Sequence, residues 1–364
     1  MSLSVTLDHR QGDFDLDVDF RSTGRLTALF GPSGSGKSTI VNLIAGLARP
    51  KQGRIEIGDT TLVDTARGIF VPVHKRRIGY VFQDSRLFPH LTVSQNLRYG
   101  RWFTSSSDRY ADFGGVIDML GIGHLLDRRP GMLSGGEKSR VALGRALLAS
   151  PRLILMDEPF AALDDGRKAE IFPYIERLRD ESEIPIVYVS HSVAEVARLA
   201  TDVVILSEGH VAARGPAAQV LSQPGVMPPS ERDEAGALIE LVMVEPDDGY
   251  GLSLLRASGG DFRLPAVDAG PGARLRVRVR ARDVTLARSK PQDVSALNIL
   301  PGTIASIAHA GPTEALVTVR CGDDLIPARI TRRSLDQLSL AEGDTIYAMV
   351  KSVTIERAQP APRA

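Results

Sequence analysis

The sequence predicts an α/β core with a parallel sheet, followed by an all-β region built from small barrels. In the first 210 residues, the continuous apolar segments 26–30, 153–156 and 184–189 alternate with stretches of helical pattern. Uninterrupted apolar runs suit strands that are buried on both faces, as in a parallel sheet covered by helices. In the last third of the chain, glycine-containing turns recur about every ten residues, which is typical of short antiparallel strands.

The composition is that of an ordinary globular protein. Of the 364 residues, 43% are apolar and 24% are charged, and 44 basic side chains balance 44 acidic ones. A dedicated nucleic-acid-binding protein usually carries a basic excess, so no nucleic-acid partner is expected. One cysteine, no apolar run long enough to cross a bilayer and no visible secretory signal together indicate a protein of a reducing compartment.

We expect three segments along the chain. Residues 1–230 would form the α/β domain, residues 231–290 a linker with a first barrel-like segment, and residues 291–360 a second small barrel with an OB-like build. The boundary is suggested by residues 214–236, which are rich in proline, glycine, serine and acidic side chains. A short helix is possible within this stretch, at residues 217–222.

Two patterns support a β structure in the tail. Residues 274–282 alternate apolar side chains with arginines, which predicts a half-buried strand whose arginines face solvent, or alternatively an anion-binding patch. There is also a weak repeat, because residues 259–266 resemble 322–328 and residues 283–286 resemble 352–355. Two similar β units in tandem would explain this repeat, although two short β patterns can also be alike by chance.

A phosphate-binding loop is predicted at residues 31–38. They fit the pattern G-x-x-x-x-G-K-[ST], follow the apolar run 26–30 and open a helical stretch. The glycines let backbone N–H groups point at phosphate oxygens, and the helix N-terminus adds a partial positive charge. Lys37 would reach the β- and γ-phosphates, and Ser38 would bind Mg²⁺. The predicted nucleotide-binding residues of this segment are Gly31, Pro32, Ser33, Gly34, Ser35, Gly36, Lys37, Ser38 and Thr39.

Charged side chains follow two of the apolar runs. Asp157 and Glu158 lie at the carboxyl end of a predicted strand, where ligands bind in open α/β sheets. Asp157 would hold Mg²⁺, and Glu158 would polarise the water that attacks the γ-phosphate. His191 follows the run 184–189 and could donate a hydrogen bond to the γ-phosphate. The alternatives are an acidic pair that caps the next helix and a purely structural histidine.

A second glycine-rich segment lies between these motifs. Residues 133–137 contain a serine and two glycines directly before the helical stretch 138–149. Free N–H groups, a helix dipole and a hydroxyl could form a second anion site, although the same residues could simply cap the helix. Gln83 follows the apolar run 78–82 and could contact Mg²⁺ or water.

This set of motifs, in this order, resembles the ATP-binding-cassette (ABC) ATPases over about residues 1–210. The resemblance implies an α/β P-loop NTPase core with a helical subdomain that binds ATP and Mg²⁺. It implies Glu158, His191 and Gln83 as the catalytic residues. It also implies Ser38, Gln83 and Asp157 as the residues around the metal ion.

The same resemblance implies a head-to-tail homodimer with two ATP molecules at its interface. Each P-loop would face Ser134, Gly135 and Gly136 of the other subunit, and Asp164 would lie near the nucleotide. The segment that follows Gln83 would receive a helix of a membrane permease. Opening of the site at Gln83 would then be coupled to movement of the permease.

The tail resembles the small molybdate-binding β-barrel over about residues 293–357. The whole chain therefore resembles the ATP-binding subunits of molybdate importers, which implies uptake of molybdate or tungstate through a separate permease. It also implies a substrate-binding protein as an indirect partner, and a peripheral location at the cytoplasmic face of the cell membrane. A tetrahedral oxyanion needs hydroxyls, N–H groups and a positive charge. Ser295, Asn298, Lys351 and Ser352 could supply them.

Other functions remain open at this stage. The chain could serve an importer of sulfate, iron or a sugar, since such importers carry similar barrels, and its tail could be only a dimerising or regulatory module. It could be an ABC ATPase that acts on DNA or ribosomes. Those proteins usually carry two fused cassettes or long coiled-coil insertions, and this sequence shows neither. A passive oxyanion-storage protein is a third class, which ATP hydrolysis would exclude.

Overall fold

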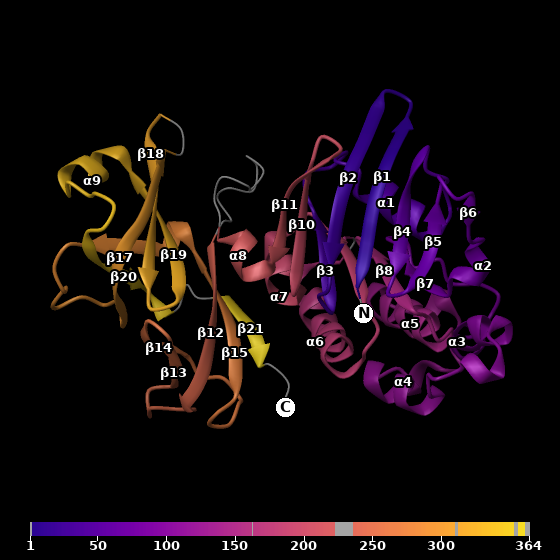
Figure 1. Ribbon diagram of the computed structural model, residues 1–364. Coiled ribbons are helices and arrows are strands. Elements are labelled where there is room, and N and C mark those ends of the chain that lie inside the picture. Colours follow the sequence, from indigo (N-terminus) through magenta and orange to yellow (C-terminus); the bar gives the residue numbers. More distant parts are fainter. Residues whose placement is uncertain (1, 162, 223–235, 310–311, 353–355, 361–364) are drawn as a thin grey trace. The chain divides into compact units, whose positions relative to one another are not determined.

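The computed structural model forms two compact units, with the boundary between Pro216 and Ala217 (Figure 1). It describes residues 2–161, 163–222, 236–309, 312–352 and 356–360. The expected segments 231–290 and 291–360 fall in the second unit together. The helix expected near the boundary is α8 (Ala217–Leu221), whereas the rest of the expected linker, 223–235, lies outside the described residues.

Among the described residues, the first unit is built on one eleven-stranded mixed sheet. Its strand order is β6-β5-β4-β1-β2-β11-β10-β3-β9-β8-β7. The sequence predicts a parallel sheet, and the pairs β10–β3, β3–β9, β9–β8 and β8–β7 are indeed parallel. The pairs around β1 are antiparallel. The strands are β1 (Leu3–Gln11), β2 (Phe14–Ser22), β3 (Leu26–Phe30), β4 (Gln52–Ile57), β5 (Thr60–Asp64), β6 (Ile69–Phe70), β7 (Ile78–Val81), β8 (Leu153–Asp157), β9 (Ile186–Ser190), β10 (Asp202–Ser207) and β11 (His210–Pro216).

The helices of this unit begin and end where local capping groups allow. The helix after the P-loop ends at Ala45 because Gly46 adopts a left-handed conformation, with φ 82°. The helix expected over 138–149 begins earlier, at Gly135, because Ser134 caps it. The α-helices are α1 (Lys37–Ala45), α2 (Val73–Arg76), α3 (Val93–Tyr99), α4 (Phe113–Leu120), α5 (Gly135–Leu148), α6 (Asp165–Glu181) and α7 (Val193–Leu199).

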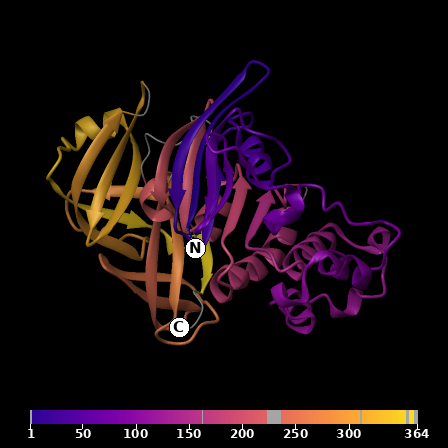
Figure 2. The same ribbon diagram turned by 45° about the vertical axis from the view of Figure 1, so that its right-hand side comes forward.

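Helices α3 and α4 both pack on α5, and the three form the helical part of the first unit. In Figure 2 they lie as a group, in purple to magenta, beside the sheet. Short 3₁₀ turns connect them, at Gly100–Phe103, Ser106–Asp108, Gly123–Leu125 and Pro130–Met132. Over the described part of the chain, no helix has the length and apolar character needed to cross a membrane.

The second unit contains two five-stranded antiparallel sheets within its described residues. Their strand orders are β14-β13-β12-β15-β21 and β19-β18-β17-β20-β16. The two orders match strand for strand when β12–β16 is taken as one repeat and β17–β21 as the next, and each repeat gives its last strand to the other repeat's sheet. The predicted tandem repeat is therefore confirmed by the strand order, whereas residues 353–355 of its second pair of similar segments lie outside the described residues. The strands are β12 (Gly236–Glu245), β13 (Leu252–Ala257), β14 (Gly260–Pro265), β15 (Arg274–Arg280), β16 (Val284–Ala287), β17 (Asn298–His309), β18 (Glu314–Cys321), β19 (Asp324–Thr331), β20 (Thr345–Val350) and β21 (Glu356–Pro360), with a 3₁₀ turn at Ala281–Asp283 and one helix, α9 (Arg332–Gln337).

The hairpin turns of the two repeats touch each other. The Ser258 hydroxyl donates to Asp324 at 2.8 Å and accepts the backbone N–H of Asp323 at 2.9 Å. A Cβ atom at Gly259 would lie 2.5 Å from the carbonyl oxygen of Cys321, so only glycine fits this close approach. The similar segments of the sequence thus occupy equivalent turns that pack together.

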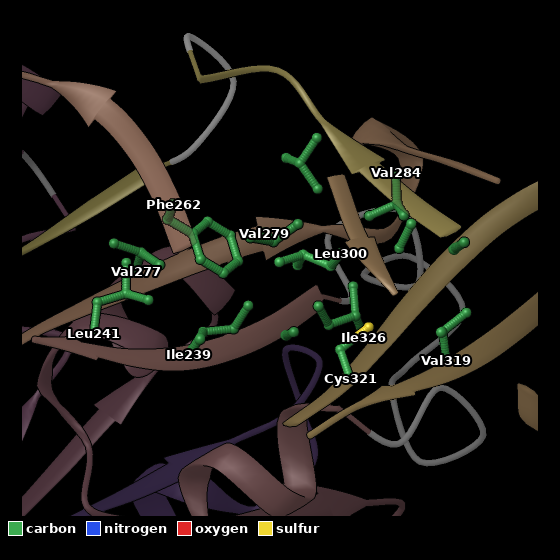
Figure 3. Packing of buried hydrophobic residues seen from close by; sticks show 14 of the residues in the cluster. Ile239, Leu241, Phe262, Val277, Val279, Val284, Leu300, Val319, Cys321 and Ile326 are labelled. Atoms are coloured by element: carbon green, nitrogen blue, oxygen red, sulfur yellow. The ribbon is translucent and has the colours of Figure 1, made fainter. Parts of the chain in front are cut away.

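One hydrophobic core joins the two sheets of the second unit. Figure 3 shows Leu241, Phe262 and Val277 of one sheet in the same cluster as Val319 of the other. The thiol of Cys321 lies in this cluster with none of its surface exposed, and burial raises its pKa to about 11. The cysteine is therefore a core residue and not a reactive thiol.

The arginine-rich strand differs from its prediction in one respect. Strand β15 exists as expected, with Leu275, Val277 and Val279 buried. Arg278, however, is only 4% exposed, so the prediction that its face is solvated is wrong at this residue. Because β15 lies between β12 and β21, side chains of two neighbouring strands flank Arg278 on its face of the sheet.

Candidate nucleotide-binding and catalytic site

The P-loop connects the buried strand β3 to helix α1. Two of its glycines are required by geometry. A Cβ atom at Gly31 would lie 2.2 Å from the carbonyl oxygen of Leu206, and Gly36 caps α1 with a φ of 100°. The first N–H groups of a helix have no acceptor within that helix, so they remain available to an anion. The local geometry is that of a phosphate-binding loop.

Lys37 bends back over this loop. Its ammonium donates to the carbonyl oxygens of Gly31 at 2.7 Å and Pro32 at 2.8 Å. Burial lowers the pKa of Lys37, and the nearby carboxylates of Glu158 and Asp157 partly oppose this shift. The Ser35 hydroxyl is buried and has no partner among the described residues. A buried ammonium and an unpartnered hydroxyl in one loop fit a bound phosphate chain.

A cavity of about 520 Å³ opens over the loop. Its volume suits a nucleotide. Two residues of the β1–β2 hairpin line it, Gln11 and Phe14, together with one carboxylate from the end of β8, Glu158. The P-loop residues that line it are Ser33, Gly34, Gly36, Lys37, Ser38 and Thr39.

The two predicted metal-binding residues next to the loop lie together. Ser38 Oγ donates to Asp157 Oδ1 at 3.1 Å, and the Tyr80 hydroxyl donates to Asp157 Oδ2 at 3.3 Å. Burial raises the pKa of Asp157, while these two hydrogen bonds lower it. A hydroxyl and one carboxylate fit Mg²⁺, which commonly takes its remaining ligands from water and substrate phosphates. Tyr80 was not predicted, because nothing in the sequence links it to Asp157.

Glu158 and His191 also meet beside the loop. Glu158 directly follows β8 in a left-handed conformation, with φ 44°, and its N–H donates to Val189 at 3.2 Å. Its Oε2 lies 3.4 Å from Nδ1 of His191. A non-glycine residue with positive φ is strained, and such strain is typical of functional sites. The structure thus brings together the two side chains predicted to act on the γ-phosphate.

The second glycine-rich segment does not line the cavity over the P-loop. Ser134 and Glu137 form a capping box at the start of α5, with N–H to oxygen distances of 3.3 and 2.7 Å. Gly135 and Gln83 line a different cavity of about 480 Å³. No P-loop residue lines this second cavity in the part of the chain that the structure describes. Among the described residues, neither Gln83 nor Ser134, Gly135 or Gly136 lines the cavity over Lys37.

A half-buried arginine ties this second segment to the residues after Gln83. Arg145 of α5 donates to the carbonyl oxygens of Arg86 at 2.7 Å and Ser85 at 3.1 Å. Its guanidinium also lies 5.4 Å from the ring centre of Phe88. Helix α5, which is capped by Ser134, is thus held to the segment where the sequence predicts permease contact.

Asp164 begins the helix that follows Glu158. It caps α6, and its Oδ1 accepts the N–H of Arg167 at 3.0 Å. The side chain also lies 3.3 Å from the Arg167 guanidinium. Asp164 does not line the cavity over the P-loop. Its role near a nucleotide therefore stays a prediction.

The four predicted oxyanion residues of the second unit divide into two pairs. Ser295 and Lys351 are exposed and line a cavity of about 550 Å³, together with Arg282 and Thr285. Two cationic side chains and two hydroxyls at one cavity are suited to an anion, while the carboxylate of Asp283, which also lines it, offsets part of the positive charge.

Asn298 and Ser352 are buried and hydrogen-bonded to the fold. The Asn298 amide accepts the N–H of Arg263 at 2.6 Å and donates to its carbonyl oxygen at 3.2 Å. It also donates to Ser352 Oγ at 3.4 Å. Asn298 therefore ties β17 to β14 across the two sheets. The structure does not bring it to the cavity of Ser295 and Lys351.

Comparison with known proteins identifies the family. A relative described as "Molybdenum import ATP-binding protein ModC" from Mesorhizobium japonicum is 57% identical over 98% of this chain and 97% of its own. The chain belongs to the molybdenum import ATP-binding proteins of the ABC transporter family. Proteins with the same description from Rhizobium meliloti and Brucella melitensis are 54% and 47% identical, covering 98% of this chain and 100% and 98% of their own. The predicted resemblance is therefore confirmed.

Domain models and solved structures agree with this family. An ABC transporter model matches residues 15–161, and a TOBE domain model matches residues 294–355. A nucleotide-free ATP-binding cassette of an ABC transporter matches with TM-score 0.51 and 27% identity, over 62% of this chain and 97% of that one. An ATP-binding subunit of another ABC transporter gives TM-score 0.52 and 26% identity, over 62% and 94%. The predicted fold class, an ABC-type P-loop core followed by an all-β domain, is confirmed.

Proposed function

We propose that this chain drives molybdate import as a homodimer that hydrolyses ATP with Mg²⁺ beneath a separate permease. The chain is the ATP-hydrolysing subunit of a molybdate importer. One observation carries its chemistry: Lys37, the Ser38–Asp157 pair and Glu158 converge beside one cavity. The proposed location is the cytoplasmic face of the membrane, with a substrate-binding protein as an indirect partner.

Each residue at the cavity has a distinct part in the proposed reaction. Lys37 and the N–H groups of the loop bind the β- and γ-phosphates. Ser38 and Asp157 would hold Mg²⁺, which neutralises charge on the phosphates when bound. Glu158 accepts a proton from the attacking water, and His191 donates a hydrogen bond to the γ-phosphate.

A second copy of the chain completes the proposed site. Within one chain, the tip formed by Ser134, Gly135 and Gly136 does not line the cavity over Lys37. In a head-to-tail pair, this tip closes over the γ-phosphate bound to the partner, and Asp164 approaches the same interface. Gln83 reaches the metal ion and water only in this closed state. Arg145 then links the tip to the residues after Gln83, where we propose that the permease docks.

The cargo is tested most directly in cells. A strain without this chain should fail to grow on nitrate at low molybdate, because nitrate reduction needs molybdenum. The wild-type sequence should restore growth, and a Lys37→Ala variant should not. Excess molybdate should also restore growth, through less selective uptake. Normal growth of the deletion strain would argue against molybdate, and rescue by added sulfate, iron or a sugar alone would assign another cargo.

For the tail, we propose an oxyanion site at the cavity of Ser295 and Lys351. Asn298 and Ser352 would stabilise this site indirectly. Their hydrogen bonds hold in place the start of β17 and the backbone next to Lys351. A charge-assisted hydrogen bond to a dianion is stronger than a neutral one, so the lysine should dominate the affinity.

Calorimetric titration of the full chain tests this site. A non-hydrolysable ATP analogue is kept saturating, so that its γ-phosphate group fills the position in the P-loop that molybdate could otherwise occupy. We expect molybdate to bind and Lys351→Ala to weaken the binding by about tenfold or more. Ser295→Ala should weaken it less. Unchanged affinity in Lys351→Ala would remove this cavity from oxyanion binding and leave the tail as a dimerising or regulatory module.

A further inference from the structure

The position of His191 is not fixed by packing around its ring. The side chain is 58% exposed, and its Nδ1 lies 3.4 Å from Oε2 of Glu158. It lies in a short turn between β9, which ends at Ser190, and α7, which is capped by Ser192. The conformation of this turn must therefore set where the imidazole lies.

A buried carboxylate lies directly behind the turn. Glu195 of α7 is only 7% exposed, and its Oε2 accepts hydrogen bonds from Tyr188 at 2.6 Å and Ser190 at 2.8 Å. Its Oε1 lies 2.9 Å from the ammonium of Lys168. A buried carboxylate is costly unless it is paired and hydrogen-bonded, and both of these oxygens have partners.

The Ser190 hydroxyl connects this carboxylate to the backbone on the far side of His191. It donates to Glu195 and accepts the N–H of Ser192 at 3.0 Å. The Ser192 hydroxyl in turn accepts the N–H of Glu195 at 3.4 Å. The residues before and after His191 are therefore both tied to Glu195.

We propose that Glu195, acting through the Ser190 hydroxyl, is the positioning group that holds His191 toward the γ-phosphate. The inference rests on the proposed role of His191. The hydrogen-bond network around Glu195 also reaches α6 through Lys168. The backbone N–H of Lys168 donates to the carbonyl oxygen of Asp164 at 3.0 Å, in the first turn of that helix. The Lys168–Glu195 ion pair thus joins the His191 turn to the helix start at Asp164.

Two hydroxyl deletions form a matched test. Ser190→Ala and Tyr188→Phe each remove one hydroxyl that donates to the same oxygen of Glu195, but only Ser190 also holds the N–H of Ser192. We expect Ser190→Ala to lower kcat about tenfold with little change in the KM for ATP, because the γ-phosphate contact is displaced. Tyr188→Phe should lower thermal stability but leave kcat near wild type. Equal effects of the two variants on kcat would overturn the proposal.

A double mutant separates this inference from the proposed function. In a His191→Ala background, Ser190→Ala should reduce kcat no further, since it acts only through the histidine. A full additional loss in that background would overturn the positioning role. If His191→Ala alone leaves kcat unchanged, the proposed role of His191 fails instead. Ser190→Thr, which keeps the hydroxyl, should restore most of the activity lost in Ser190→Ala.

Discussion

Glu158→Gln is expected to bind ATP normally and to lose almost all turnover. The amide has the shape of the carboxylate but cannot take a proton from the attacking water. The phosphate contacts of Lys37 and Ser38 remain, so the KM for ATP should not rise. Loss of a general base lowers kcat by about 10²–10⁴-fold. Phosphate release measured at saturating ATP, together with equilibrium binding of a fluorescent ATP analogue, checks both halves of this prediction.

The chain contains a close control for this substitution. Glu208 also has a positive φ, 48° against 44° for Glu158, but it lies exposed in the turn between β10 and β11. Glu208→Gln should hydrolyse ATP like the wild type. Wild-type hydrolysis in Glu158→Gln as well would remove Glu158 from its catalytic role. Weakened ATP binding in that variant would point to a structural defect instead of lost water activation.

The sequence predicts best those parts of the site whose residues lie within one short contiguous segment. The P-loop depends on glycines at fixed spacing after a buried strand, and both features are visible in residues 26–38. Asp157 and Glu158 end an apolar run, and parallel strands bring such ends to one edge of a sheet. For this reason the pairing of Ser38 with Asp157 follows from sequence position alone.

Contacts between distant side chains could not be predicted in this way. The Tyr80 hydroxyl on β7 donates to Asp157 at the end of β8, and Lys168 of α6 forms an ion pair with Glu195 of α7. In neither pair does the separation of the two residues along the sequence indicate that they are in contact. Asn298 was predicted to bind an anion because its residue type is suitable. The structure shows its amide bonded to the backbone of Arg263, a contact between sheets that no local pattern encodes.

The strand topology of the tail, too, could be predicted only in part from the sequence. Similar segments in residues 259–266 and 322–328 predict two related β units, and the two sheets confirm them. The exchange of β16 and β21 between the sheets was not predicted. A strand that is similar in both repeats can pair in either sheet, so local sequence does not decide between them. The single core shared by both sheets is consistent with the exchanged arrangement.

A mixture of two inactive variants should regain activity if two copies share each site. Lys37→Ala disables the P-loop of its own chain, whereas Ser134→Asp keeps the cap of α5 and places a negative charge at the tip offered to the partner. A mixed pair contains one site with both defects and one site with neither. With equal amounts and random pairing, about a quarter of wild-type ATPase activity should return. Phosphate release across a series of mixing ratios at saturating ATP measures this recovery.

The control for this mixture combines two defects that lie on the same side of the interface. Lys37→Ala and Glu158→Gln both disable the cavity over the P-loop, so each site of their mixed pair carries one defect and no activity should return. Recovery with Ser134→Asp but not with Glu158→Gln would mean that the serine–glycine tip acts on the nucleotide of the other chain. Absence of recovery at every ratio would contradict the shared site. The separation of Gly135 from the cavity over Lys37 would then have to be closed by movement within one chain, which the ties of Arg145 to Ser85 and Arg86 oppose.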